Sequence, residues 1–302
     1  MKPKETINLY RVISLLVIAL VTFGVMGGLC AKSHLYPDEW LSMFFLTLIF
    51  LLACMFELEY ERKQKGISAN TQTTFIRLSV TYTVSGGLIY AISYLPEFYR
   101  PVMIPVILLT AVSNSMVAVS FGLFFDLVLA LTVGGSFYAL AAYMMLTMLA
   151  AVLAQALKEK KYRMGVSLLT FFFSLMIPEL FSYLSTKEMQ KYSLLYAFGT
   201  AFLTFLTAAF LFHRLLHEAD QEIENHLLDI VSEDYSEVKA LKDFSMVEYR
   251  HAVKVSDIAC RCAKEVGYRA NLCLAGGFYY RMGRWIGEPY IKNAVNKAES
   301  LC

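Results

Sequence analysis

The chain has 302 residues, of which 57% are hydrophobic and 17% charged, and its formal net charge is +2 at pH 7. A soluble domain is nearer half apolar and a quarter charged. The small net charge gives no electrostatic reason to expect nucleic acid as a partner. Because the apolar excess lies in long runs before residue 212, the composition predicts an all-α integral membrane protein with a polar C-terminal region.

The first apolar segment, Ile13–Leu29, follows the basic stretch "MKPKETINLYR". It is longer than the hydrophobic part of most signal peptides. Leu29 directly precedes Cys30, where lipoprotein cleavage requires a small residue. We therefore interpret the segment as an uncleaved transmembrane helix.

Eight apolar segments are candidates for membrane spans, since a spanning helix needs about 20 mostly apolar residues. They are Ile13–Leu29, Trp40–Met55, Leu78–Leu95, Val102–Val112, Met116–Leu131, Phe137–Leu157, Val166–Leu184 and Leu194–Phe212. The fourth is the shortest and has Pro101 and Pro105 at its start, so it and the fifth could instead form one irregular unit. The pattern favours eight spans over seven.

Basic residues in short loops predict the orientation. The stretches "MKPKETINLYR", "ERKQKG" and "KEKKYR" are the basic segments, and eight spans place all three on one side. The expected protein is therefore a multi-pass cell-membrane protein with both termini in the cytoplasm and with membrane lipid around its helices.

Two acidic residues fall within the predicted spans. Asp126 stands in the wholly apolar stretch "FGLFFDLVLAL", and Glu179 stands near the end of its span in "MIPELF". An ionisable residue inside a membrane is a functional candidate by default. Asp126 could fix helix packing through a polar contact or carry a transport function, while Glu179 could simply reach the interface.

The C-terminal region divides into a helical linker, 213–246, and a smaller part, 247–302, after the bundle 1–212. Apolar residues recur along the linker at Leu216, Ile223, Leu227, Ile230, Val238 and Leu241. The next helix has a predicted buried stripe of Ala252, Val255, Ala259, Cys262, Ala263 and Val266, and Gly267 is placed to end it. Further helices are expected over about 270–283 and 289–301. Residues 247–302 are too few for an independent core, so we expect them to pack on the linker, on another protein or a second copy, or on further sequence.

Two stretches resemble the seven-transmembrane HD-domain family, bacterial membrane proteins whose characterised members hydrolyse cyclic di-AMP. These are "MIPVILLTAVSNSMVAVSFGLFFDLVLALTVGGSFYALAAYMM" and "LLHEADQEIENHLLDIVSEDYSEVKALKDFSMVEYRHAVKVSDIACRCAKEVG". The resemblance implies a cytoplasmic, partial HD-type domain at residues 247–302. It also implies that an active member would use two divalent metals such as Mn or Fe.

The resemblance also assigns positions to the family's motif, a His on one helix followed by a Tyr-His-Asp-x-Gly-Lys stretch. His251 matches the first His, Tyr279 and Gly283 match the Tyr and Gly, and Arg284 stands for the Lys. Tyr280 and Arg281 stand where the family has its metal-binding His and Asp. The large extracellular domain and the later ligands of the family are missing, and no His follows His251.

These replacements remove the metal chemistry that the resemblance implies. Arg281 stays protonated and would repel a cation, while the phenol of Tyr280 titrates near 10 and replaces an imidazole poorly. We therefore expect no metal cofactor and a catalytically inactive sensor or regulatory protein. Arg281 and Arg284, with Lys254 nearby, could still hold a phosphate of a cyclic dinucleotide.

Two other functions stay open at this point. The first is an active, metal-dependent cyclic-dinucleotide phosphodiesterase whose missing ligands come from outside this chain. The second is a transporter-like bundle organised around Asp126, although the sequence shows neither an internal repeat nor matched broken helices.

Overall fold

The computed structural model describes residues 9–63, 72–188, 192–280, 287–289 and 292–293. Every regular element among them is helical, which confirms the all-α prediction. The chain divides into two compact units, Met1–Leu216 and His217–Cys302, so the predicted linker belongs largely to the second unit. The helices of the first unit are α1 (Leu9–Lys32), α2 (Pro37–Lys63), α3 (Gln72–Ile92), η1 (Glu97–Tyr99), α4 (Met103–Val112), α5 (Ser115–Thr132), α6 (Phe137–Leu157), α7 (Arg163–Thr186), α8 (Ser193–Leu206) and the π-helical η2 (Thr207–Leu211).

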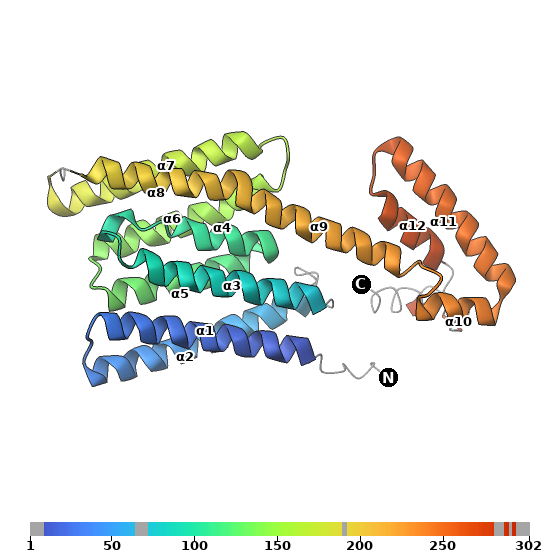
Figure 1. Cartoon of the computed structure of the whole chain (residues 1–302), viewed down its shortest axis with the longest axis horizontal. Helices are drawn as coiled ribbons and strands as arrows, with labels where there is room; N and C mark the ends of the chain where they lie inside the picture. The colour runs from blue at the N-terminus through green and yellow to red at the C-terminus, as the bar shows by residue number, and fades with distance from the viewer. Residues whose placement is uncertain (1–8, 64–71, 189–191, 281–286, 290–291, 294–302) are drawn as a thin grey trace. The chain divides into compact units, whose positions relative to one another are not determined.

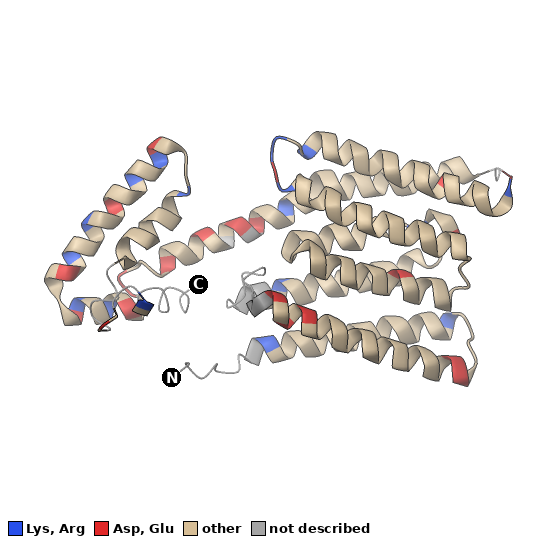
Figure 2. Ribbon diagram, turned by 180° about the vertical axis from the view of Figure 1, so that it is seen from behind, with Lys and Arg blue, Asp and Glu red and all other residues tan. Residues whose placement is uncertain are grey.

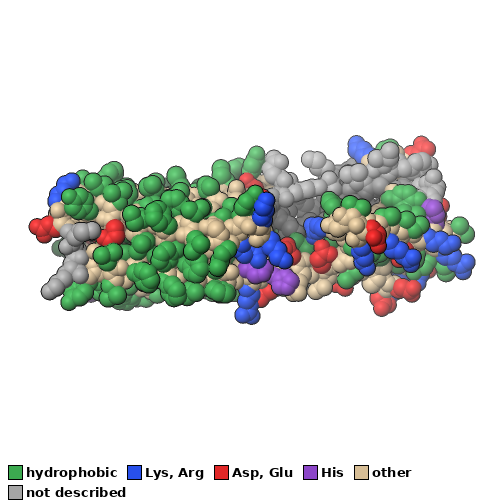
Figure 3. Space-filling model, turned by 90° about the horizontal axis from the view of Figure 1, so that it is seen from above, with side chains coloured by type: hydrophobic (Ala, Val, Ile, Leu, Met, Phe, Trp, Pro, Cys, Tyr) green, Lys and Arg blue, Asp and Glu red, His purple; other side chains and the backbone are tan. Residues whose placement is uncertain are grey.

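The first unit is a bundle whose long helices run roughly along one direction (Figure 1). Seven helices in the described part of the chain are long and apolar enough to cross a membrane, the last of them continuing from Ser193 into α9 (Phe212–Asp229). Charged residues gather near the helix ends (Figure 2). Hydrophobic side chains cover the bundle face seen in Figure 3. This combination is the one expected of helices surrounded by lipid.

Helix α4 differs from the predicted span 102–112 in its length and surroundings. It has ten residues, or about 15 Å at 1.5 Å per residue, and the hydrocarbon core of a bilayer is about 30 Å thick. Nine of these ten residues are buried, because α4 packs against α3, α5 and α6. A short helix fully enclosed by other helices needs no lipid-facing surface, which explains why its sequence is apolar throughout.

Small residues bring the bundle helices close together. A Cβ on Gly122 of α5 would lie 2.6 Å from Val106 Cγ2 and 2.9 Å from Thr147 Cγ2. A Cβ on Gly86 of α3 would lie 2.9 Å from Val21 Cγ1 of α1. Transmembrane helices associate through this kind of close approach, since lipid supplies little hydrophobic driving force between them.

The turn between α4 and α5 is built from the stretch "SNS" at residues 113–115. The Asn114 side chain accepts a hydrogen bond of 2.9 Å from the backbone N–H of Val117, so it caps α5. Its amide group also donates to Glu61 Oε2 at the end of α2, at 2.6 Å. At the start of α1, Arg11 pairs with Glu59 of α2. The starts of α1 and α5 and the end of α2 are therefore tied together by polar contacts.

The second unit is formed by most of α9 together with α10 (Ser236–Phe244), α11 (Met246–Val266) and α12 (Ala270–Tyr279). Its buried hydrophobic core combines linker residues with residues of the two last helices: Leu227, Ile230, Val238, Leu241, Ala252, Ala275, Phe278 and Tyr279. Most of the linker's apolar positions thus belong to this core, whereas Leu216 packs against the core of the first unit. The small C-terminal part gains a core it could not build alone.

Gly267 ends α11 as predicted, with φ of +74° and its N–H bonded to the last turn. The predicted buried stripe of this helix is only partly right. Ala252 and Ala263 are buried, but Cys262 is exposed and Val266 is 83% exposed. The last turn of α11 points these two side chains away from α12, and Ser256 is buried instead. The expected helix over 289–301 lies almost wholly outside the described residues.

Candidate functional site

Helices α11 and α12 form a tightly packed antiparallel pair joined by the turn at Gly267. The closest approach is at Gly277, where a Cβ would lie 2.9 Å from Ser256 Cα, 3.1 Å from Ala259 Cβ and 3.2 Å from the Val255 carbonyl oxygen. Two of these three obstacles are backbone atoms, which cannot rotate away. Glycine is therefore required here by packing, and this close approach sets which residues at the free end of the pair meet.

His251 and Tyr280 meet at that end. The distance between His251 Nε2 and the Tyr280 hydroxyl is 2.6 Å, and the two rings lie at 45° with centroids 6.1 Å apart. Both side chains are exposed, Tyr280 by 50%. The residues that the sequence assigned to the motif's first His and second His are thus brought into direct contact, as a hydrogen-bonded pair at the surface.

The neighbouring Tyr279 turns the other way and anchors α12 in the core. Its hydroxyl donates to the backbone carbonyl of Ile230, its ring packs edge-on against Phe278, and its side chain is 6% exposed. Burial raises the pKa of the Tyr279 phenol, so it remains a neutral donor at physiological pH. Adjacent tyrosines on α12 therefore have opposite roles, one holding the helix and one presenting a hydroxyl to His251.

The described residues do not fit the metal centre that the resemblance implies. Among them, no group of three or more His, Cys, Asp or Glu side chains is placed to hold a metal ion. The Nε2 atom of His251 is engaged by a phenol instead of facing a second ligand. Arg281, Gly283 and Arg284 lie outside the described residues, and Lys254 is exposed one turn after His251 on α11.

A second polar cluster lies at the corner between α9, α10 and α11. Glu233 accepts hydrogen bonds from Lys242 Nζ at 2.8 Å and from the Tyr249 hydroxyl at 3.2 Å. The Lys242 ammonium also lies 4.6 Å from the centre of the Tyr249 ring. Hydrogen bonding to Lys242, together with its charge, lowers the pKa of Glu233, and the same contact raises the pKa of Lys242. All three groups are at the surface, so this cluster ties the corner together without forming a pocket.

Within the bundle, Asp126 is 1% exposed and accepts a hydrogen bond of 2.6 Å from the Thr147 hydroxyl. The contact joins α5 to α6 one turn away from Gly122, where the same two helices approach closely. This is the packing contact that the sequence left open as one interpretation of Asp126. The hydroxyl donor offsets part of the cost of burying this acidic side chain.

Glu179 has more buried surroundings than the sequence indicated. Its Oε1 atom and the hydroxyl of Tyr99 are both buried, and within the described part of the chain neither makes a hydrogen bond. Ser182 and Ser193 lie near the Tyr99 hydroxyl together with the Glu179 carboxylate, but not in hydrogen-bonding geometry. Buried polar atoms in this arrangement are commonly bridged by ordered water.

Sequence reasoning missed the buried polar contacts of the segment between α3 and α4. Arg100 is 5% exposed and donates to the Tyr143 hydroxyl of α6 at 3.2 Å and to the Leu95 carbonyl at 3.3 Å. Tyr143 in turn donates to the Glu97 carbonyl. The stretch "LPEFYRP" has the pattern of a plain loop. The one sequence feature that could have indicated buried polar contacts is the presence of a basic and an acidic residue in a short segment between apolar helices.

No protein-family model matches the chain, and no curated protein or solved structure matches it either. The interpretation of its function therefore rests on the residues and their geometry.

Proposed function

We propose that this chain is a multi-pass membrane protein with a degenerate HD-type helical unit, and that it acts as a sensor or regulator instead of a hydrolase. The observation that carries the proposal is the hydrogen bond between His251 and Tyr280. These residues occupy the positions of two metal ligands in the motif that the sequence resembles. The packing of α11 against α12 supports an HD-type arrangement of these helices, and the contact between His251 and Tyr280 supports the loss of metal binding at these positions.

The chemical argument concerns the lone pair of the imidazole. A histidine that binds a metal directs one ring nitrogen at the ion and is usually oriented through the other. Here Nε2 is hydrogen-bonded to a phenol at 2.6 Å, and the next residue, Arg281, carries a permanent positive charge. Neither neighbour favours a divalent cation, so we propose that the unit works without metal-dependent hydrolysis.

A bound nucleotide is the ligand that the remaining residues favour. Lys254 is exposed one turn beyond His251, and the sequence places Arg281 and Arg284 shortly after Tyr280. Guanidinium and ammonium groups bind phosphate oxygens through charge-assisted hydrogen bonds. We propose cyclic di-AMP as the ligand, held by these side chains on the cytoplasmic side where the basic loops predict that both termini lie.

The test uses the full-length protein in lipid nanodiscs, with Mn²⁺ and cyclic di-AMP. We expect no hydrolysis and no stoichiometric bound metal. We expect measurable binding of cyclic di-AMP that falls at least several-fold in Arg281→Ala and is unchanged in Lys264→Ala, a matched loss of charge at the far end of α11. Binding that is absent, or that Arg281→Ala leaves unchanged, overturns the nucleotide site.

The same experiment distinguishes this proposal from the alternative of an active phosphodiesterase. Metal-dependent hydrolysis of cyclic di-AMP that His251→Ala abolishes would establish an active phosphodiesterase, with its missing ligands supplied from outside this chain. Under our proposal His251→Ala changes no turnover, because there is none, and leaves the metal content as it was.

A further inference from the structure

Four polar side chains come together inside the bundle where η1, α7 and α8 meet. Tyr99 of η1 is 2% exposed, and Ser182 of α7 and Ser193 of α8 lie near its hydroxyl. The Glu179 carboxylate of α7 also lies near it, with its Oε1 atom buried. We call these four residues the Glu179 cluster. The end of α7 and the start of α8 lie at the end of the bundle away from the start of α1 (Figure 1), so the cluster is near that end.

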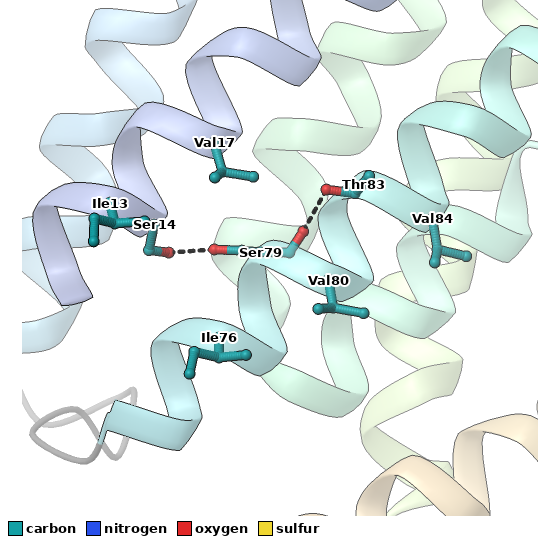
Figure 4. Close-up of a pocket in the computed structure, with 8 residues that line it drawn as sticks. All are labelled: Ile13, Ser14, Val17, Ile76, Ser79, Val80, Thr83 and Val84. Atoms are coloured by element: carbon teal, nitrogen blue, oxygen red, sulfur yellow. Dashed lines mark hydrogen bonds between the residues drawn. The ribbon is translucent and has the colours of Figure 1, made fainter.

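The Glu179 cluster differs from the hydroxyl groups between α1 and α3, which have partners within those two helices. There the Ser14 and Ser79 hydroxyls lie 2.5 Å apart, and the Thr83 hydroxyl donates to the Ser79 carbonyl at 2.7 Å (Figure 4). In the Glu179 cluster, neither the Tyr99 hydroxyl nor Glu179 Oε1 makes a hydrogen bond to any described residue. Buried polar atoms without a partner bear the cost of desolvation. The cluster therefore favours a bound species that contacts both oxygens.

The side chains of the cluster indicate the chemical class of that species. Their polar atoms are all oxygens, from one carboxylate, one phenol and two serine hydroxyls, and the ionised carboxylate supplies one negative charge. Hard metal cations prefer oxygen ligands. A divalent ion would keep an uncompensated charge in a buried site, and no group of three His, Cys, Asp or Glu side chains in the described ranges is placed to hold one. One carboxylate balances a monovalent cation.

Arg100 is the basic residue nearest to the cluster along the chain, since it directly follows Tyr99. Its guanidinium donates to the Tyr143 hydroxyl of α6 and to the Leu95 carbonyl. These contacts engage Arg100 elsewhere, so it does not supply the counter-charge of Glu179. Glu179 is half-buried and lies two helical turns, about 10 Å, before the end of α7. This position is close enough to the end of the spanning helix for an ion to enter from water.

We propose that the Glu179 cluster binds one monovalent alkali-metal cation, with the Glu179 carboxylate and the Tyr99 hydroxyl as its main ligands and the two serine hydroxyls beside them. The ion supplies the partner that both buried oxygens lack among the described residues. Its ligands come from η1, α7 and α8, so a bound ion ties these three elements together at one end of the bundle. This site does not depend on the nucleotide site proposed for the second unit.

The first test is thermal unfolding of the full chain in phosphatidylcholine nanodiscs, in NaCl, KCl or N-methyl-D-glucamine chloride at equal ionic strength. We expect a melting temperature about 2–4 °C higher in an alkali salt than in the organic salt, because a ligand that binds only the folded state stabilises it. Glu179→Gln removes the charge but keeps the side-chain shape, and it should abolish this difference. Glu188→Gln, the same change at an exposed position after α7, should retain it.

The second test counts bound ions with radioactive Na⁺ and, as a probe for K⁺, radioactive Rb⁺. We expect one ion per folded chain and an affinity at least about tenfold lower in Glu179→Gln. Tyr99→Phe removes one ligand oxygen and should weaken binding several-fold, whereas Tyr183→Phe, the same change at an exposed position of α7, should not. In the first test each variant is compared between salts, so a general loss of stability does not imitate the loss of the site.

Any of three results overturns the proposal. Equal melting temperatures of the wild type in all three salts, with no bound ion, show that water alone contacts the cluster. A difference between salts that Glu179→Gln retains places the ion elsewhere, and if Asp126→Asn abolishes that difference, the ion lies at the buried carboxylate of α5. Equal losses in Glu179→Gln and Glu188→Gln assign the effect to surface charge at this end of the bundle.

Discussion

The two units each contain a polar pair of the same length in very different surroundings. Asp126 and Thr147 lie 2.6 Å apart inside the bundle, and His251 and Tyr280 lie 2.6 Å apart at the surface of the second unit. Asp126 is 1% exposed and Tyr280 is 50% exposed. A buried acceptor that loses its donor bears the full cost of desolvation, whereas an exposed group turns to water. Burial therefore makes the first pair the more costly of the two to break.

We expect the largest loss of stability from a substitution at Gly277, where close packing between α11 and α12 holds the second unit together. Gly277→Ala drives a Cβ against the Ser256 backbone, and we expect a loss of about 2–3 kcal/mol in the stability of that unit. Gly276→Ala is the matched control, because a Cβ added there would meet nothing within 4 Å and alanine favours a helix by up to about 1 kcal/mol.

The measurement is amide hydrogen exchange of the α11 and α12 peptides in the full-length protein, read by mass spectrometry. Protection should fall in Gly277→Ala and hold or rise in Gly276→Ala. Equal behaviour of the two variants would show that the close approach at Gly277 is not what holds the pair. It would also remove the reason why His251 and Tyr280 meet.

A smaller loss is expected from breaking the buried pair of the bundle. Thr147→Val removes the donor to Asp126 without changing the side-chain shape, and leaving that acceptor unsatisfied costs about 1–2 kcal/mol. Thr83→Val is the control, since its hydroxyl is exposed and bonds only within α3; we expect a change below about 0.5 kcal/mol. Melting temperatures in one detergent check both, and equal shifts would mean that burial does not distinguish these hydroxyls.

How much of the structure the sequence could predict depends on how far apart along the chain the contacting residues lie. The linker positions Leu227, Ile230, Val238 and Leu241 recur at helical spacing and are all buried, because periodicity reports which residues share a helix face. Periodicity does not report whether another helix covers that face, and Val266 is exposed for this reason.

Hydrophobic periodicity could not predict the polar contacts inside the bundle. The Arg100–Tyr143 contact joins residues 43 apart along the chain, and no local pattern specifies it. The proximity of Tyr99 to Glu179 likewise depends on how η1 packs against α7. Candidate sites made within one helix pair, such as His251 and Tyr280, are accessible from spacing, while those made by three elements require the tertiary structure.

The smallest expected effect is the pH dependence of the exposed cluster at Glu233. Its pKa is lowered from 4.5 in the folded chain by the hydrogen bond and charge of Lys242. A lowered pKa means that this contact stabilises the fold fully above about pH 4.5 and loses that contribution as the pH falls through the folded value. The melting temperature of wild type should therefore exceed that of Glu233→Gln near pH 7, and the two should converge as the pH falls through the lowered pKa of Glu233. Lys242→Gln should show the same convergence, since it removes the other partner.

A difference in melting temperature that stays constant with pH would assign the effect to the shape of the side chain. Because both partners are at the surface, added salt should also narrow the gap, which it cannot do for the buried pair at Asp126.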